Sequence, residues 1–175
     1  MTLYDTTIGY WLNCQPEKIN KLIVECSSEY PLNRIKAAEE LARIARKQCA
    51  DAVIPAIPAL ITMLSDRTTL VWATKYPFTE PRYGPNSVTK SPGGEALTAI
   101  IQTARTTRNP GGVIRLLIIA LDDEKRRPHA ADALRNITGQ DFGCGSVPSI
   151  SLSCDVGKWK QWYKVVYEEN KREEK

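Results

Sequence analysis

The chain has 175 residues, of which 42% are hydrophobic and 25% charged, and 24 Lys and Arg against 20 Asp and Glu give a formal net charge of +4. These are the values of an ordinary globular domain, so they exclude a fully disordered chain, and so small a charge excess does not by itself indicate nucleic-acid binding. The one histidine, His129, excludes metal sites built from several histidines, and since no apolar run approaches the roughly 20 residues that cross a bilayer, we expect no membrane span.

Hydrophobic stripes at helical spacing predict three apolar helices, at about 16–28, 53–64 and 110–121. Each precedes a second helix with the pattern small, small, acidic, x, Leu, x, x, Ile. The three copies of this pattern are AAEELARI at 37–44, GGEALTAI at 93–100 and AADALRNI at 130–137. The Leu and Ile share one helix face, and the small residues allow a neighbouring helix to approach closely. The sequence therefore predicts a unit of helix, short turn and helix, present three times.

The spacing of these units indicates an insertion in the second one. Leu97 and Leu134 are 37 positions apart, which suits a two-helix repeat of about 40 residues, but Leu41 and Leu97 are 56 positions apart. The excess falls in residues 73–92, where proline, glycine and polar residues break helical periodicity.

The turns Leu64-Ser65-Asp66 and Leu121-Asp122-Asp123 and the helix at 129–137 resemble HEAT-like repeats of the bacterial type. The ending at 138–143, followed by Asp155, Trp159, Trp162 and Tyr163, is also similar to such proteins. The resemblance covers about 16–167 and implies a single all-α domain, an armadillo-like α-solenoid of about three helix pairs plus a C-terminal cap helix. The implied units are repeat 1 at about 16–48, repeat 2 at about 51–107 with the insertion at 73–92, repeat 3 at about 109–138, and the cap at 139–170. The sequence departs from the pattern at Gly93-Gly94, where alanine is usual, and in a second insertion at 144–154.

The C-terminal helix is predicted to begin at Asp155 as its N-cap and to place Trp159, Trp162, Tyr163 and Val166 on one stripe. We interpret this stripe as a cap that packs on the third repeat with Phe142 beneath it; the alternative is an exposed aromatic platform for a ligand. Asn109 before Pro110 predicts a capped start for the third apolar helix.

Five cysteines raise the question of disulfides. If the first two helices form a hairpin that turns near Pro31, Cys14 and Cys49 meet at its open end, because they lie 17 and 18 residues from the turn. Cys144 and Cys154 stand at the two ends of the second insertion, and a disulfide between them would close it. Cys26 is expected to remain a free thiol on the buried stripe of the first helix. These pairs favour an oxidising compartment outside the cytoplasm, whereas five reduced cysteines would be compatible with the cytoplasm. No four-ligand zinc pattern is present, and we expect no metal.

The proline-rich insertion is the strongest candidate for a binding site. Aromatic and arginine side chains are the usual anchors of protein interfaces, and prolines limit the entropy lost on binding. The candidate partner-binding residues are Trp72, Tyr76, Phe78, Arg82 and Tyr83. In the alternative interpretation these aromatics fold back and cover the second repeat.

Basic residues on the second helices offer a different function, a nucleic-acid-binding surface, although interspersed acidic residues favour ordinary solvated helix faces. The sequence contains no phosphate-binding glycine loop and no nucleophile elbow, so we predict no cofactor and no catalytic residues. The predicted function is a non-catalytic scaffold that binds another protein. The resemblance also implies a weaker alternative, an accessory protein similar to bilin lyases.

Overall fold

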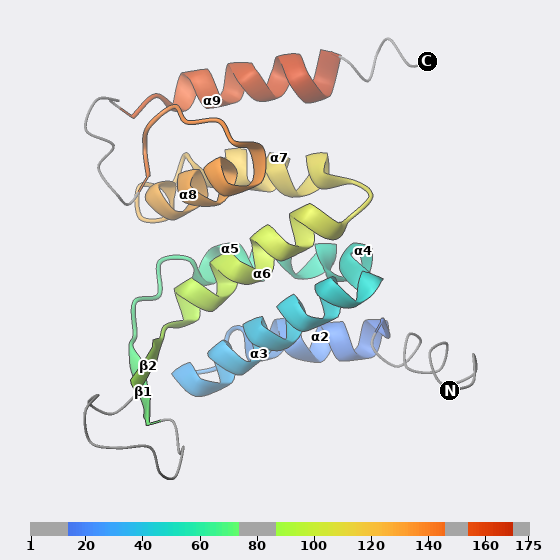
Figure 1. The fold of residues 1–175 in the computed structure, drawn as a ribbon, viewed down its shortest axis with the longest axis vertical. Helices are drawn as coiled ribbons and strands as arrows, with labels where there is room; N and C mark the ends of the chain where they lie inside the picture. The colour runs from blue at the N-terminus through green and yellow to red at the C-terminus, as the bar shows by residue number, and fades with distance from the viewer. Residues whose placement is uncertain (1–13, 74–86, 146–153, 170–175) are drawn as a thin grey trace, which may run out of the picture.

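The computed structural model describes residues 14–73, 87–145 and 154–169. These residues are mostly helical, which confirms the predicted all-α class (Figure 1). The elements in chain order are α2 (Pro16–Glu25), α3 (Pro31–Ile44), the π turn η1 (Ala45–Cys49), α4 (Ala50–Val53), the 3₁₀ turn η2 (Ile54–Ala56), α5 (Ile57–Met63), β1 (Leu70–Ala73), β2 (Ser87–Lys90), α6 (Pro92–Thr106), α7 (Pro110–Ala120), α8 (Arg127–Thr138), α9 (Val156–Tyr163) and the π turn η3 (Lys164–Glu169).

The helices pack as pairs, and equivalent helices of successive pairs are in contact. The pairs are α2 with α3, α5 with α6, and α7 with α8. Helix α6 contacts both α3 and α8, so these three helices form one row. In the second row, α2 contacts α4 and η2, and α5 contacts α7. Figure 1 shows α2 and α3 at one end of the molecule and α9 beyond α7 at the other.

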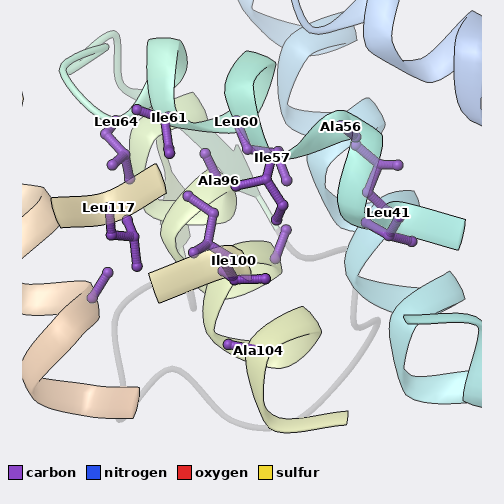
Figure 2. Close-up of a cluster of buried hydrophobic side chains, with 14 of the residues drawn as sticks. Leu41, Ala56, Ile57, Leu60, Ile61, Leu64, Ala96, Ile100, Ala104 and Leu117 are labelled. Carbon is purple, nitrogen blue, oxygen red and sulfur yellow. The ribbon is translucent and has the colours of Figure 1, made fainter. Parts of the chain in front are cut away.

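One continuous hydrophobic core joins the pairs (Figure 2). Leu41 of α3, Ile57 and Leu60 of α5, Ile100 of α6 and Leu117 of α7 are all fully buried in it. Alanines at the small positions of the repeated pattern, Ala37, Ala38, Ala130 and Ala131, are buried as well and allow the helix axes to approach. Burial of a side chain of this size stabilises the fold by about 1.5–3 kcal/mol, so each pair depends on its neighbours for stability.

The single helix predicted at 53–64 is divided in the structure. Pro55 and Pro58 each lack a backbone N–H and disturb the preceding turn, so the chain passes from α4 through η2 into α5. The predicted boundary between the first two repeats, at 48–51, is also continuous helix, because η1 connects α3 directly to α4.

A two-stranded antiparallel ribbon, which the sequence analysis did not predict, forms the base of the insertion. Its register runs from Leu70 opposite Lys90 to Ala73 opposite Ser87. Val71, Val88 and Thr89 are β-branched and favour this extended backbone. Helix α6 begins directly after the ribbon, where the Ser91 hydroxyl accepts a hydrogen bond from the Gly94 amide at 3.1 Å.

The cap helix begins as predicted, since the Asp155 carboxylate accepts a hydrogen bond from the Lys158 amide at 2.9 Å. Trp159 is fully buried, and the Phe142 ring meets it edge-on with 4.9 Å between centroids, which supports the packed rather than the exposed interpretation. The prediction that Val166 faces the core is wrong, because this side chain is 37% exposed. The wider π turn η3 moves the next inward position by one residue, and Tyr167 packs on Trp162 and Tyr163 instead.

Two further local predictions concern the cysteines and Asn109. The structure contains the disulfides Cys14–Cys49 and Cys144–Cys154, with Cα–Cα distances of 5.5 and 4.2 Å, and Cys26 is a buried free thiol. The Asn109 side chain makes no capping hydrogen bond, so that prediction is wrong; α7 begins instead on Pro110 at its first position, with the Gly112 amide donating to the Asn109 carbonyl at 3.3 Å.

Candidate protein-interaction site

The predicted binding residues divide between the described and the undescribed parts of the chain. Tyr76, Phe78, Arg82 and Tyr83 lie outside the described residues. Trp72 lies in β1, where its backbone is paired with that of Val88. The structure therefore defines the base of the insertion, which consists of the ribbon and the residues that hold it.

The first anchor of the insertion is Asp66, which follows α5. Its carboxylate accepts a hydrogen bond from Arg34 Nε of α3 at 2.8 Å and another from the Thr68 amide at 3.0 Å. Arg34 also donates to the carbonyl oxygens of Ser28 and Glu29 at 2.6 and 3.0 Å. Burial alone would raise the pKa of Asp66, but the amide and hydroxyl of Thr68 together with the Arg34 guanidinium hold that pKa below its ordinary range. This carboxylate is therefore ionised and fixes the start of the insertion to α3.

The second anchor joins the two ends of the insertion directly. The Gly93 amide, in the first turn of α6, donates to the Asp66 carbonyl oxygen at 3.0 Å. A Cβ atom at Gly93 would lie 2.8 Å from the carbonyl oxygens of both Asp66 and Leu64, which is too close for any side chain. This contact explains why glycine stands where the repeated pattern elsewhere has alanine.

The third anchor is an ion pair between Lys90 of β2 and Glu39 of α3. The hydrogen bond from Lys90 to Glu39 raises the pKa of Lys90, so the lysine stays charged. The ribbon is thus tied to α3 at its last residue as well as through Asp66.

A hollow of about 440 Å³ lies next to this ion pair, between α3 and α6. We call it the α3/α6 hollow; it is lined by Lys36, Glu39, Glu40, Ala42, Arg43, Arg46, Lys90, Glu95 and Thr98. Four of these side chains are cationic and three are acidic. Glu40 is bonded to Arg43 Nε at 2.6 Å and to Lys18 at 2.6 Å, and the Arg43 hydrogen bond, ahead of Lys18, lowers the pKa of Glu40 to about 2.

Lys36 and Arg46 make no ion pair with another described residue, and both are exposed. The pairs Lys90–Glu39 and Arg43–Glu40 neutralise most of the remaining charge in the hollow. Burial raises the pKa of Glu95, while Lys90 opposes that shift. The α3/α6 hollow therefore presents a slightly positive, hydrogen-bonding surface beside the ribbon.

The acidic lining was missed in the sequence analysis, although the repeated pattern contains its signal. Glu39 and Glu95 occupy the same acidic position of that pattern, and Asp132 occupies it in the third copy. Because α3, α6 and α8 lie in one row, this position recurs along a single face of the molecule.

Many of the basic residues on and before the second helices are bonded to other parts of the fold. Arg34 is bonded to Asp66, Arg43 to Glu40, and Arg126 to Asp123 at 3.3 Å. In addition, Arg127 Nε donates to the Leu121 carbonyl at 2.8 Å, and Arg135 Nη2 donates to Asp141 at 3.3 Å. These five cations act within the fold, whereas Lys36, Arg46, Lys47 and Lys125 are exposed and make no ion pair with another described residue.

A larger hollow of about 600 Å³ lies beside the Cys14–Cys49 disulfide and includes Arg46, Asp51, Thr106 and Arg108. The Thr107 hydroxyl and then the Arg108 amide donate to the Asp51 carboxylate and lower its pKa, so this carboxylate is engaged within the fold.

His129 is partly buried, and its Nε2 lies 3.5 Å from Arg67 Nη2. Burial, and secondarily the Arg67 charge, lower the pKa of His129. Over residues 14–73, 87–145 and 154–169, no group of three or more His, Cys, Asp or Glu side chains could hold a metal ion. Within those same ranges no helix has the length and apolar character needed to cross a bilayer.

Comparison with known proteins adds no further assignment: no family model, no curated protein and no solved structure matches this chain.

Proposed function

We propose that this chain is a HEAT-like α-solenoid that acts as a non-catalytic scaffold and binds another protein through its insertion and the neighbouring α3/α6 hollow. The solenoid arrangement is supported by the two rows of helices, in which α6 contacts both α3 and α8 and α5 contacts α7. In such a stack each pair contacts only its neighbours, and insertions project from one face.

The observation that carries the proposal is the 3.0 Å hydrogen bond between the Gly93 amide and the Asp66 carbonyl. It brings the ends of the insertion together at the position where a short turn would otherwise connect the two helices. We therefore expect the helix pair to keep its connection when the insertion is removed.

The anchors also support a binding role. Arg34–Asp66 and Lys90–Glu39 connect the base of the insertion to α3. A preorganised base lowers the entropy that a loop loses on binding, which is a main cost of association. Aromatic and arginine residues of the insertion then supply contact area, and Lys36 and Arg46 of the α3/α6 hollow favour an acidic region of the partner.

A nucleic-acid partner is the weaker candidate because the arginines of the second helices are bonded within the fold. Binding to DNA depends on unpaired cations that release counterions from phosphates. A slightly positive hollow with three carboxylates suits a folded protein better than a phosphate backbone.

The proposal is tested by separating the insertion from the fold. In the first variant, a Glu-Lys linker replaces residues 67–90; Glu and Lys are the residues that follow Asp123 in the equivalent turn of the third pair. In the second variant, full-length, Tyr76, Phe78, Arg82 and Tyr83 are changed to alanine. Its matched control changes two exposed residues at the other end of the molecule, Lys158 of α9 and Val165 of η3, to alanine.

Both insertion variants are expected to keep the helical circular dichroism spectrum and a cooperative thermal transition. Chemical cross-linking and affinity capture from the source cells should recover a partner with the wild type and the control but not with the two insertion variants. Unfolding of the linker variant would assign the insertion to the core, and unchanged capture by the full-length alanine variant would refute the proposed site.

A further inference from the structure

A second surface lies at the opposite end of the molecule from the ribbon, where α9 runs beside α7 (Figure 1). A groove of about 360 Å³ opens between these helices. We call it the α7/α9 groove; its lining includes Arg115, Ile118, Ile119, Asp122, Tyr163 and Lys164. None of these residues belongs to the insertion or to the α3/α6 hollow.

The floor of the groove is apolar and is held by contacts within the fold. Ile118 is buried, and Ile119 beside it on α7 is 57% exposed, so it presents apolar surface to the groove. The Tyr163 hydroxyl donates to the Gly111 carbonyl at 3.4 Å, and its ring stacks on Tyr167 with 5.5 Å between centroids. An apolar partner residue would therefore meet a preformed surface with little to reorganise.

The charges around this floor are unbalanced. Lys160, which also lines the groove, is bonded to both oxygens of Asp122 at 2.7 and 3.0 Å, so this pair neutralises itself. Arg115 on α7 and Lys164 in η3 are exposed and make no ion pair with another described residue. An apolar strip is thus flanked by two cations that have no ion pair with a described residue, Arg115 from α7 and Lys164 from η3, which continues α9.

We propose that the α7/α9 groove docks an acidic amphipathic helix of a protein partner. The apolar side of such a helix would cover Ile119 and Tyr163, and its flanking carboxylates would pair with Arg115 and Lys164. Recognition of a helix in a groove depends on this combination of an apolar strip and complementary charges. Nucleic acid fits less well, because exposed Ile119 would face a phosphate backbone instead of an apolar partner residue.

The test uses a fluorescein-labelled peptide of about 18 residues, long enough to form a helix, with leucines along one stripe and glutamates on both sides. Fluorescence anisotropy is measured with the full chain at low salt. Two groove variants are compared with the wild type. The first is the single substitution Ile119→Asp, and the second is the double substitution Arg115→Glu and Lys164→Glu. Their matched controls are Val24→Asp, at an exposed valine of α2, and Lys125→Glu, at an exposed lysine before α8.

We expect saturable binding of the acidic peptide, weakened about tenfold or more by either groove variant and within twofold of wild type for both controls. A peptide with lysine in place of glutamate should bind at least tenfold more weakly. The alanine variant of the insertion should bind the acidic peptide like the wild type, so the two proposed sites fail or succeed separately.

Three results would overturn the proposal. The first is equal binding of the acidic and basic peptides, and the second is a groove variant that binds as tightly as wild type. The third is the absence of peptide binding, whether or not a straight-chain fatty carboxylate or a second copy of the chain occupies the groove instead.

Discussion

Gly93 lies where the start of α6 meets the end of α5, and substitution by alanine is expected to destabilise the protein. The new Cβ would lie 2.8 Å from two backbone carbonyl oxygens, of Asp66 and Leu64, and 3.2 Å from that of Met63. Backbone atoms at a helix end move less readily than a side chain. Overpacking of this kind costs about 1–3 kcal/mol, and lengthening of the Gly93–Asp66 hydrogen bond adds about 0.5–1.5 kcal/mol.

The intrinsic preference of alanine for helices opposes this cost by up to about 1 kcal/mol. The net expectation for Gly93→Ala is a loss of about 1–3 kcal/mol in the free energy of unfolding. For a chain of this length, such a loss lowers the melting temperature by about 2–12 °C. Urea denaturation followed by circular dichroism measures it as a lower midpoint at an unchanged slope.

Helix α7 provides matched controls, because it also begins with Pro-Gly-Gly. A Cβ at Gly111 would lie 3.0 Å from Cδ1 of Tyr167, a side chain that can move, and a Cβ at Gly112 would lie 3.6 Å from Asn109 in ordinary contact. The expected order of stability is therefore Gly112→Ala, then Gly111→Ala, then Gly93→Ala. A Gly93→Ala protein as stable as Gly112→Ala would refute the close approach of α6 to the end of α5.

The substitution Glu40→Gln tests the ion pairs of α3. Folding lowers the pKa of Glu40 from 4.5 to about 2. The contribution of this carboxylate to the free energy of unfolding is therefore complete above pH 4.5 and disappears as the pH falls toward 2. Solvent screening reduces this contribution to about 1 kcal/mol, so denaturation midpoints of wild type and variant should differ at pH 7 and converge near pH 2; a constant difference would contradict the assignment. Replacement of the Cys14–Cys49 pair by serine, which opens a span of 35 residues, should cost about 4 kcal/mol, and the same change in the Cys144–Cys154 pair, which spans 10, about 3 kcal/mol. If loss of the Cys144–Cys154 disulfide lowered the free energy of unfolding more than loss of the Cys14–Cys49 disulfide, the entropy of the unfolded chain would not be the main source of this stabilisation. Trp159→Ala should cost about 3–5 kcal/mol in thermal or urea unfolding, whereas a small effect would place this ring outside the core.

The helix pairs were predictable because their signals are local. Pro16, Pro31, Pro92 and Pro110 each stand at the first or second position of a helix in the structure. Apolar residues at a spacing of three and four then mark the buried face of each helix. The Asp155 cap and the burial of Trp159 follow from the same kind of local pattern.

The ribbon and the π turns could not be read in the same way. Each strand has four residues, and their pairing joins segments separated by the insertion. The alternation in Ser87-Val88-Thr89-Lys90 is too short to distinguish a strand from a loop. In η3, one extra residue per turn transfers the inward position from Val166 to Tyr167, and no residue type in the sequence marks that change.

The anchors of the candidate site depend on residues that are far apart in the chain. Arg34 and Asp66 are separated by 32 positions, and Glu39 and Lys90 by 51. The glycines at 93 and 94 depart visibly from the repeated pattern in the sequence. The reason for Gly93 is seen only in the structure, where the end of α5 lies too close for a side chain. Single-sequence patterns therefore located the insertion without identifying what holds it.

Cys26, the buried residue near the end of α2, has a consequence for measuring local motion. All other cysteines are in disulfides, so it is the one thiol of the chain. Burial, and secondarily the charge of Glu25, raise its pKa to about 11, so only about one molecule in a thousand carries the reactive thiolate at pH 8. Separation of α2 from α3 would restore an ordinary thiol pKa and expose the sulfur to a disulfide reagent. The native protein thus carries its own chemical probe, whose labelling rate reports how often the first helix pair opens while the rest of the molecule stays folded.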